Sequence, residues 1–118
     1  CSDHSPEDAE MKNREFDLAA FGIIGLETAY AAANTYSGLN KKELVEKMAI
    51  RPREILNIPV PVIDRGHNAN VTLFNPTQKW TYSKSDIKSK SANTPFVGTT
   101  FTGKALGAYN NKQYQEAK

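Results

Sequence analysis

Apolar positions in the first half of the chain recur at helical spacing. From residue 23 onward they fall at steps of three and four, which places them on one helical face: Ile23, Leu26, Tyr30 and Ala33. Ser37 and Gly38 end this predicted helix, because glycine takes the left-handed conformation at a helix end. The apolar face of this helix has little elsewhere in the chain to cover it.

Two further helices are predicted before residue 58. Asn40 can cap a helix over residues 41–48, with Leu44 directed inward. A separate third helix begins at residues 51–52, because proline is accepted in the first turn of a helix. Residues 1–58 are therefore predicted to be helical after an irregular start.

Residues 59–118 show shorter apolar runs that favour strands and loops. A strand is predicted over residues 71–74, and Asn75 with Pro76 closes it. Trp80 and Tyr82 alternate with polar neighbours, as on a half-buried strand.

The end of the chain predicts a surface loop followed by a hairpin. The segment 84–93 is rich in serine and lysine, which is typical of a surface loop. A hairpin over residues 101–115 turns at residues 110–111, because asparagine tolerates the positive φ of a tight turn.

Composition and charge narrow the classes of function. The 118 residues are 39% hydrophobic and 24% charged, which is ordinary for one globular domain. The net charge of +2 is spread along the chain, and no apolar run reaches the roughly 20 residues that span a bilayer. We therefore expect neither a nucleic-acid nor a membrane partner. A single cysteine, Cys1, excludes an internal disulfide and fits a reducing compartment such as the cytoplasm.

The Asp3–His4 pair is the first candidate for chemistry. It lies beside carboxylates at Glu7, Asp8 and Glu10, which suggests a metal or acid–base site. Spacing alone favours a solvated acidic loop instead, because one carboxylate and one imidazole are too few ligands for zinc. His67, in a Gly-His-Asn turn, is expected to be exposed and structural. No nucleophile elbow, P-loop or dinucleotide motif is present.

Several longer motifs follow one another along the chain: SDHSP, EMKNREFDLAAFGIIGLETAY, RPREILNI, NANVTLFNP and SKSANTPFVGTTFTGK. In this order they resemble the carboxyl-terminal part of the dihydroorotases, a family of the metal-dependent amidohydrolase superfamily. The resemblance covers essentially all of the chain. The blocks FGIIGLET and NTPFVG are specific, whereas the Ser-Asp-His motif also occurs in hydantoinases and allantoinases.

The resemblance implies an α/β fold that is only part of a larger architecture. Residues 1–58 would be the last strand end and last helices of a TIM-type (β/α)8 barrel, where catalytic groups gather at the carboxyl ends of strands. Residues 59–118 would be the carboxyl-terminal segment of a small β-sandwich. We therefore expect the chain to be the carboxyl-terminal piece of a longer protein and to be inactive alone. An independent small binding domain remains an alternative, and it requires the 118 residues to fold cooperatively by themselves.

The resemblance also implies a site. Asp3 matches the family's metal-bound aspartate, which takes a proton from the metal-activated hydroxide and delivers it to the leaving nitrogen. Phe21 and Gly22 match the segment whose backbone contacts the substrate ring, although Gly22 also suits a simple helix-entry turn. The implied cofactor is zinc, with its remaining ligands outside this chain.

The implied activity is that of a full-length dihydroorotase, which reversibly cyclises N-carbamoyl-aspartate to dihydroorotate in pyrimidine biosynthesis. Two alternatives stay open: a non-catalytic dihydroorotase-like subunit that partners aspartate transcarbamoylase, and a hydantoinase- or allantoinase-type enzyme. The other implied partners are the rest of the parent chain and a second copy in a homodimer.

Three departures from the family pattern keep the non-catalytic alternative open. Glu7 stands where the family has a histidine that helps hold the substrate carboxylate. Two carboxylates at ~4 Å repel by roughly 4 kcal/mol at an effective dielectric near 20. Ala20 replaces a proline, and Asn70 replaces an aspartate for which a structural role is expected.

Overall fold

A three-stranded antiparallel sheet organises the computed structural model, which describes residues 2–117. The chain first forms helical elements and then the sheet, in the order α1 (Ala9–Lys12), α2 (Ala29–Tyr36), α3 (Lys41–Val45), the π-helical turn η1 (Glu46–Ile50), α4 (Arg51–Ile55), β1 (Val71–Thr81), the 3₁₀ turn η2 (Lys84–Asp86), β2 (Thr100–Asn110) and β3 (Gln113–Glu116). The molecule is thus a small α/β unit, as the sequence predicts at this coarse level.

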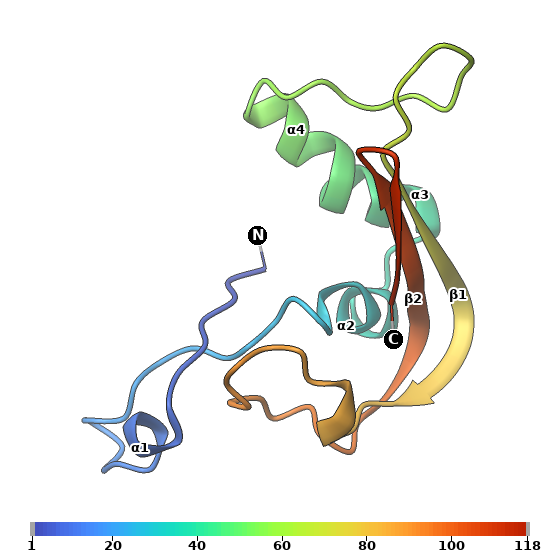
Figure 1. The fold of residues 1–118 in the computed structure, drawn as a ribbon. Coiled ribbons are helices and arrows are strands. Elements are labelled where there is room, and N and C mark those ends of the chain that lie inside the picture. The colour runs from blue at the N-terminus through green and yellow to red at the C-terminus, as the bar shows by residue number, and fades with distance from the viewer. Residues whose placement is uncertain (1, 118) are drawn as a thin grey trace.

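The sheet has the order β1-β2-β3, and its two long strands are strongly curved (Figure 1). β1 and β2 pair from Val71 opposite Tyr109 to Thr81 opposite Thr100. Helix α2 packs against β2 on the concave side of this curve. The segment that contains α1 projects away from the sheet.

The core lies between α2 and the end of the sheet where β1 stops and β2 begins. Phe101 is fully buried, and Tyr82 and Ala31 are almost as inaccessible. Phe96 meets the Phe101 ring edge-on, with 5.5 Å between ring centroids. Burying one such aromatic side chain contributes about 1.5–3 kcal/mol, so this aromatic cluster attaches the helix to the sheet.

The predicted start of the first long helix is wrong. Helix α2 begins at Ala29 and not at residue 23. Residues before it are bound elsewhere, because Ser5 N–H donates to Ile23 O and Ile24 N–H donates to Asn93 O. These long-range partners remove the backbone groups that a helix would use. The predicted end is confirmed, with Gly38 at a φ of +70° after the last turn.

The cap at Asn40 is confirmed, but the predicted break between the second and third helices is wrong. Asn40 Oδ1 accepts from Glu43 N–H at 3.0 Å, and Glu43 returns the contact to the Asn40 N–H. From there α3, η1 and α4 run on without interruption to Ile55. The π-helical turn ends at Ile50, two residues before Pro52, whose missing N–H would otherwise interrupt a regular helix.

The predicted closure of the first strand at Asn75 and Pro76 is also wrong. β1 continues through this pair to Thr81, and the register against β2 shifts between Asn75 and Lys79. Asn75 Oδ1 accepts the Thr77 and Gln78 N–H groups, so the side chain satisfies a bulge within the strand. The hairpin of β2 and β3 is confirmed, with its turn one residue later than predicted: the positive φ values are at Asn111 and Lys112.

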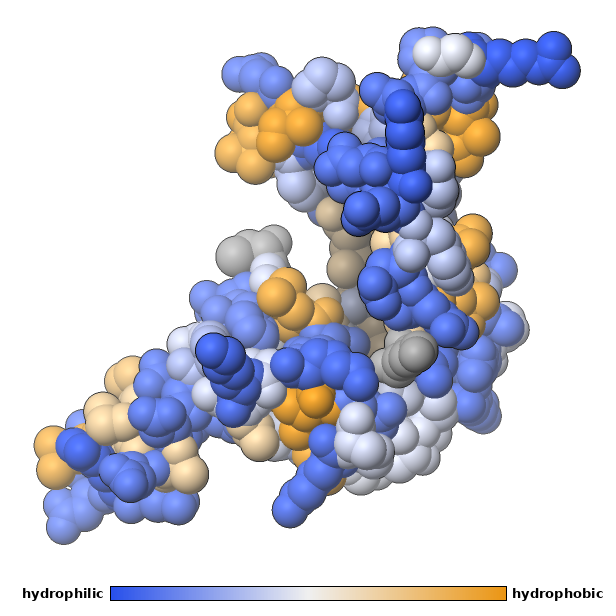
Figure 2. Space-filling model, in the orientation of Figure 1, coloured by the Kyte–Doolittle hydropathy of each residue, from blue (hydrophilic) through white to orange (hydrophobic). Residues whose placement is uncertain are grey.

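Much apolar surface remains uncovered. Phe16, Phe21 and Ile63 are 93%, 87% and 92% exposed, and Figure 2 shows apolar groups at the α4 end and over the projecting α1 segment. The radius of gyration is 16.3 Å, against roughly 13 to 14 Å for a compact domain of this length. Among residues 2–117, the helices are all too short or too polar to traverse a lipid bilayer.

The first prediction concerns the 118 residues produced alone. We expect no sharp cooperative thermal transition by circular dichroism, because the buried cluster is too small to offset the conformational entropy lost on folding while so many apolar side chains stay exposed. The full-length parent protein is the control. A monodisperse monomer with one sharp transition would contradict this expectation and favour the independent binding domain.

Candidate functional site

One cavity of about 500 Å³ gathers the residues that the resemblance singles out. Asp3, Phe21 and Gly22 all border it, although they come from two separate segments. The full lining is Ser2, Asp3, Lys12, Phe16, Ala19, Ala20, Phe21, Gly22 and Ile23. The cavity therefore combines a carboxylate, an ammonium group and apolar walls.

Asp3 has an unusual backbone conformation. Its φ is +47°, in the left-handed region that non-glycine residues rarely adopt, and its side chain is exposed. Such a conformation costs about 1–3 kcal/mol and persists where neighbouring contacts impose it. Here the next residues supply those contacts, since His4 forms a parallel bridge with Ile23 and Ser5 N–H donates to Ile23 O at 2.9 Å.

The His4 imidazole is an anchor for this segment. The Gly25 and Leu26 N–H groups donate to His4 Nδ1 at 3.0 and 3.3 Å. Nδ1 is thus an acceptor, which assigns the ring proton of the neutral imidazole to Nε2. Sequence reasoning considered His4 only as part of a metal or acid–base pair and missed this role, because its partners lie more than 20 residues away.

Gly22 lies too close to the Asp3 segment for any side chain. A Cβ there would be 2.5 Å from Ser5 Cβ, and the φ of +96° favours glycine independently. Because α2 begins only at Ala29, Gly22 is not the entry turn of that helix. The adjacent Phe21 side chain is 87% exposed and borders the cavity.

Two residues that sequence reasoning missed hold the Phe21–Gly22 backbone. Lys12 Nζ donates to Ala20 O at 2.7 Å and to Gly22 O at 2.9 Å. Asn93 Nδ2 donates to Gly22 O at 3.3 Å and to Ser5 O at 2.8 Å. The specific motif NTPFVG contains Asn93, so a signal for this residue was present in the sequence.

Glu27 binds the loop that carries Asn93 to the turn before α2. The Lys88 and Ser89 N–H groups donate to Glu27 Oε1 at 3.1 and 2.7 Å. Burial alone would raise the pKa of Glu27, but these hydrogen bonds and one from its own N–H outweigh burial and lower the pKa. The carboxylate therefore stays ionised and links the turn before α2 to the loop.

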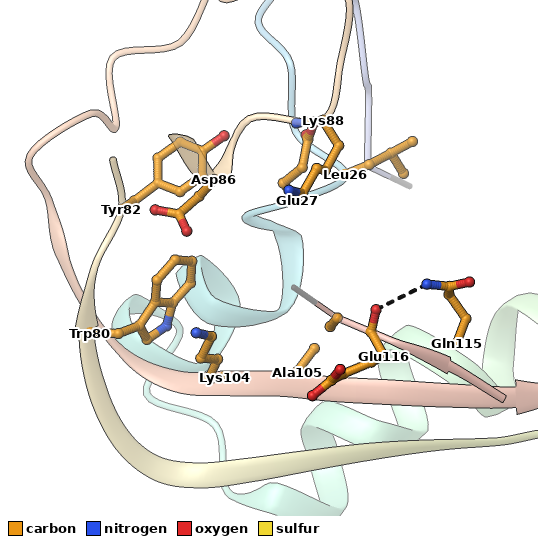
Figure 3. Close-up of a pocket in the computed structure, with 11 residues that line it drawn as sticks. Leu26, Glu27, Trp80, Tyr82, Asp86, Lys88, Lys104, Ala105, Gln115 and Glu116 are labelled. Carbon is orange, nitrogen blue, oxygen red and sulfur yellow. Dashed lines mark hydrogen bonds between the residues drawn. The ribbon is translucent and has the colours of Figure 1, made fainter. Parts of the chain in front are cut away.

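A second cavity, of about 530 Å³, lies against the sheet and is lined by none of the predicted site residues (Figure 3). Lys104 and Trp80 both line this cavity, and Lys104 Nζ lies 5.3 Å from the centre of the Trp80 ring. The buried Tyr82 hydroxyl has no hydrogen-bond partner among residues 2–117, and burial raises the pKa of Tyr82. The lining of this second cavity carries both signs of charge, from Glu27 and Asp86 and from Lys88 and Lys104. The cavity therefore shows no preference for one class of ligand.

The metal-binding capacity of the described chain is limited. Within residues 2–117, no three His, Cys, Asp or Glu side chains are grouped to hold a metal ion. The exposed carboxylate of Asp3, which borders the cavity, offers oxygen atoms of a type that zinc accepts as ligands. Glu7 does not line this cavity, and its N–H donates to Asn93 Oδ1 at 3.2 Å. Cys1 lies outside the described residues.

Comparison with known proteins finds several relatives that are named dihydroorotases. No family model matches the chain. It is 42% identical over 108 residues to a dihydroorotase of Syntrophus aciditrophicus, covering 89% of the chain and 25% of the relative. A dihydroorotase of Chlorobaculum tepidum is 37% identical (96% of the chain, 27% of the relative), and one of Clostridium acetobutylicum is 35% identical (100% and 29%). The chain thus spans between a quarter and a third of the length of these relatives.

The second prediction tests the close approach at Gly22. Gly22→Ala should destabilise the intact protein more than Gly98→Ala, by about 1–3 kcal/mol. Both glycines have positive φ, at +96° and +87°, but only Gly22 has atoms in the space of a Cβ. Denaturant unfolding measures the difference, and equal losses would show that the 3–5 and 22–25 segments do not pack as described.

Proposed function

The chain belongs to the dihydroorotase family and corresponds to the carboxyl-terminal portion of its members, and we propose that the longer protein is a zinc-dependent dihydroorotase. It would reversibly cyclise N-carbamoyl-aspartate to dihydroorotate in the cytoplasm, for pyrimidine biosynthesis. One observation carries the proposal: in a chain 35–42% identical to dihydroorotases, Asp3, Phe21 and Gly22 border the same cavity.

Within the longer protein, residues 1–58 would complete a TIM-type barrel and residues 59–118 a small β-sandwich. The parallel bridge between His4 and Ile23 agrees with a place beside parallel barrel strands. The outer edges of β1 and β3 have no partner strand among residues 2–117, which supports a larger sheet in the parent. The exposed apolar side chains would then be covered by the rest of that protein.

Asp3 would hold zinc through a carboxylate oxygen and move a proton during the reaction. When bound, zinc supplies Lewis-acid polarisation and a water that is activated near neutral pH. In the ring-opening direction, the Asp3 carboxylate would accept a proton as water adds to the ring amide carbon, and would give it to the ring nitrogen as the C–N bond breaks. Cyclisation would be the reverse, with the proton taken from the carbamoyl nitrogen as the C–N bond forms and water leaves. Its exposed position on the cavity wall leaves it accessible to both metal and substrate.

The backbone of Phe21 and Gly22 would contact the substrate ring. The Gly22 carbonyl already accepts from Lys12 and Asn93. In contrast, the Phe21 N–H, the Phe21 carbonyl and the Gly22 N–H make no hydrogen bond within residues 2–117. These three groups are therefore available to the amide groups of a cyclic substrate.

The third prediction tests Asp3 in the full-length protein. Asp3→Asn should lower kcat for cyclisation by roughly 10²–10⁴-fold, the usual size of a general acid–base contribution, and should reduce bound zinc. Asp64→Asn is the control, because Asp64 is exposed and lines neither cavity described above. Kinetics of dihydroorotate formation and metal analysis measure the two effects. Full activity of Asp3→Asn would refute its role, and turnover of only hydantoins or allantoin by the wild type would favour those alternatives.

The fourth prediction tests Glu7, the departure that favours a non-catalytic partner of aspartate transcarbamoylase. If Glu7 faces the substrate carboxylate, as its place in the family pattern implies, Glu7→His should lower the KM for the anionic substrate about tenfold for each 1.4 kcal/mol of repulsion removed. Glu10→His, on the exposed surface of α1, is the matched control. An unchanged KM would agree with the position of Glu7 outside the cavity lining and would remove this departure as an argument against catalysis.

A further inference from the structure

We propose that Lys12 and Asn93 are positioning residues that together hold the Gly22 carbonyl and so set the Phe21–Gly22 backbone against Asp3. The inference rests on the proposed function, because it concerns the geometry of that same site. Neither side chain is assigned a part in the chemistry.

The Gly22 carbonyl oxygen is fully engaged by the two side chains. Lys12 Nζ lies 2.9 Å and Asn93 Nδ2 3.3 Å from this oxygen. A carbonyl oxygen has two lone pairs, so these bonds use its ordinary capacity. The two donors come from distant parts of the chain, one at the end of α1 and one in the loop before β2. Rotation of this peptide plane would break both bonds.

Lys12 holds both carbonyls that flank Phe21. Its ammonium group donates to Ala20 O at 2.7 Å as well as to Gly22 O. Bonds from a charged donor are roughly twice as strong as neutral ones. Lys12 also borders the cavity with Asp3 and Phe21, so loss of its ammonium group would free the backbone that faces a ligand.

Asn93 joins the segment around Gly22, proposed to contact the substrate, to the segment that follows Asp3, proposed to hold the metal. Its amide donates to Ser5 O at 2.8 Å and accepts from Glu7 N–H at 3.2 Å. Its own carbonyl accepts from Ile24 N–H at 3.1 Å. Asp3 has a left-handed backbone conformation, which a non-glycine residue keeps only where surrounding contacts impose it.

The two residues differ in what they hold, so their variants should differ. Within residues 2–117, the Lys12 ammonium donates only to the backbone around Phe21, whereas the Asn93 side chain also binds Ser5, which follows Asp3. Loss of Lys12 should therefore disturb substrate binding alone. Loss of Asn93 should disturb substrate binding and the affinity of Asp3 for zinc.

The test uses three variants of the full-length protein: Lys12→Met, Asn93→Ala and the control Asn34→Ala. Asn34 is also half-buried, and its amide donates to two backbone carbonyls, at 3.2 Å on Pro76 and 2.8 Å on Thr102, away from the site. All three variants should lose thermal stability. Only Lys12→Met and Asn93→Ala should raise the KM for dihydroorotate, by about tenfold or more, which corresponds to ~1.4 kcal/mol of substrate binding lost from the displaced backbone.

Zinc affinity, measured by competition with a chromophoric chelator, supplies a readout that does not depend on turnover. It should fall in Asn93→Ala and match the wild type in Lys12→Met and Asn34→Ala. If Asn93→Ala does not fold, the KM and zinc affinity of Lys12→Met decide the outcome. If the wild type is active and the KM of Lys12→Met equals that of Asn34→Ala, the inference is overturned but the proposed function is not. An inactive wild type would overturn the proposed function and the inference together.

Discussion

The contact between the segment after Asp3 and the segment around Gly22 is the constraint on which the candidate site depends. Ser5 and Gly22 lie so close that residue 22 has no room for a Cβ. The Asn93 amide then bonds both segments, at Ser5 O and Gly22 O. Without this approach, the carboxylate of Asp3 and the backbone of Phe21 would not border one cavity.

Local sequence signals predicted the parts of the fold that depend on neighbouring residues. The capping box of Asn40 and Glu43, the stop at Gly38 and the β2–β3 hairpin all follow from residues within one turn. Two of the errors, at the start of α2 and at the end of β1, have a common physical cause, which is competition from distant partners. Residues 23–25 leave the predicted helix because His4, Ser5 and Asn93 bind their backbone, and pairing with β2 carries β1 through Pro76.

The residues of the candidate site also fall into two groups, those that the sequence indicated and those that only the structure revealed. Asp3, Phe21 and Gly22 were found through a resemblance in motifs, which marks residues by type and order. The supporting contacts of His4, Lys12 and Asn93 join residues between 8 and 88 positions apart, and periodicity cannot reveal such pairs. Side chains that donate to backbone carbonyls leave no pattern of apolar spacing, so the geometry of the cavity required the structure.

The most direct test of the central claim is a crystal structure of the full-length protein with zinc and bound dihydroorotate. We predict an Asp3 carboxylate oxygen about 2.0–2.2 Å from zinc and the Phe21–Gly22 backbone against the substrate ring, with Ser5 still packed on Gly22. An Asp3 side chain turned to solvent, with the ring bound elsewhere in the protein, would contradict the account.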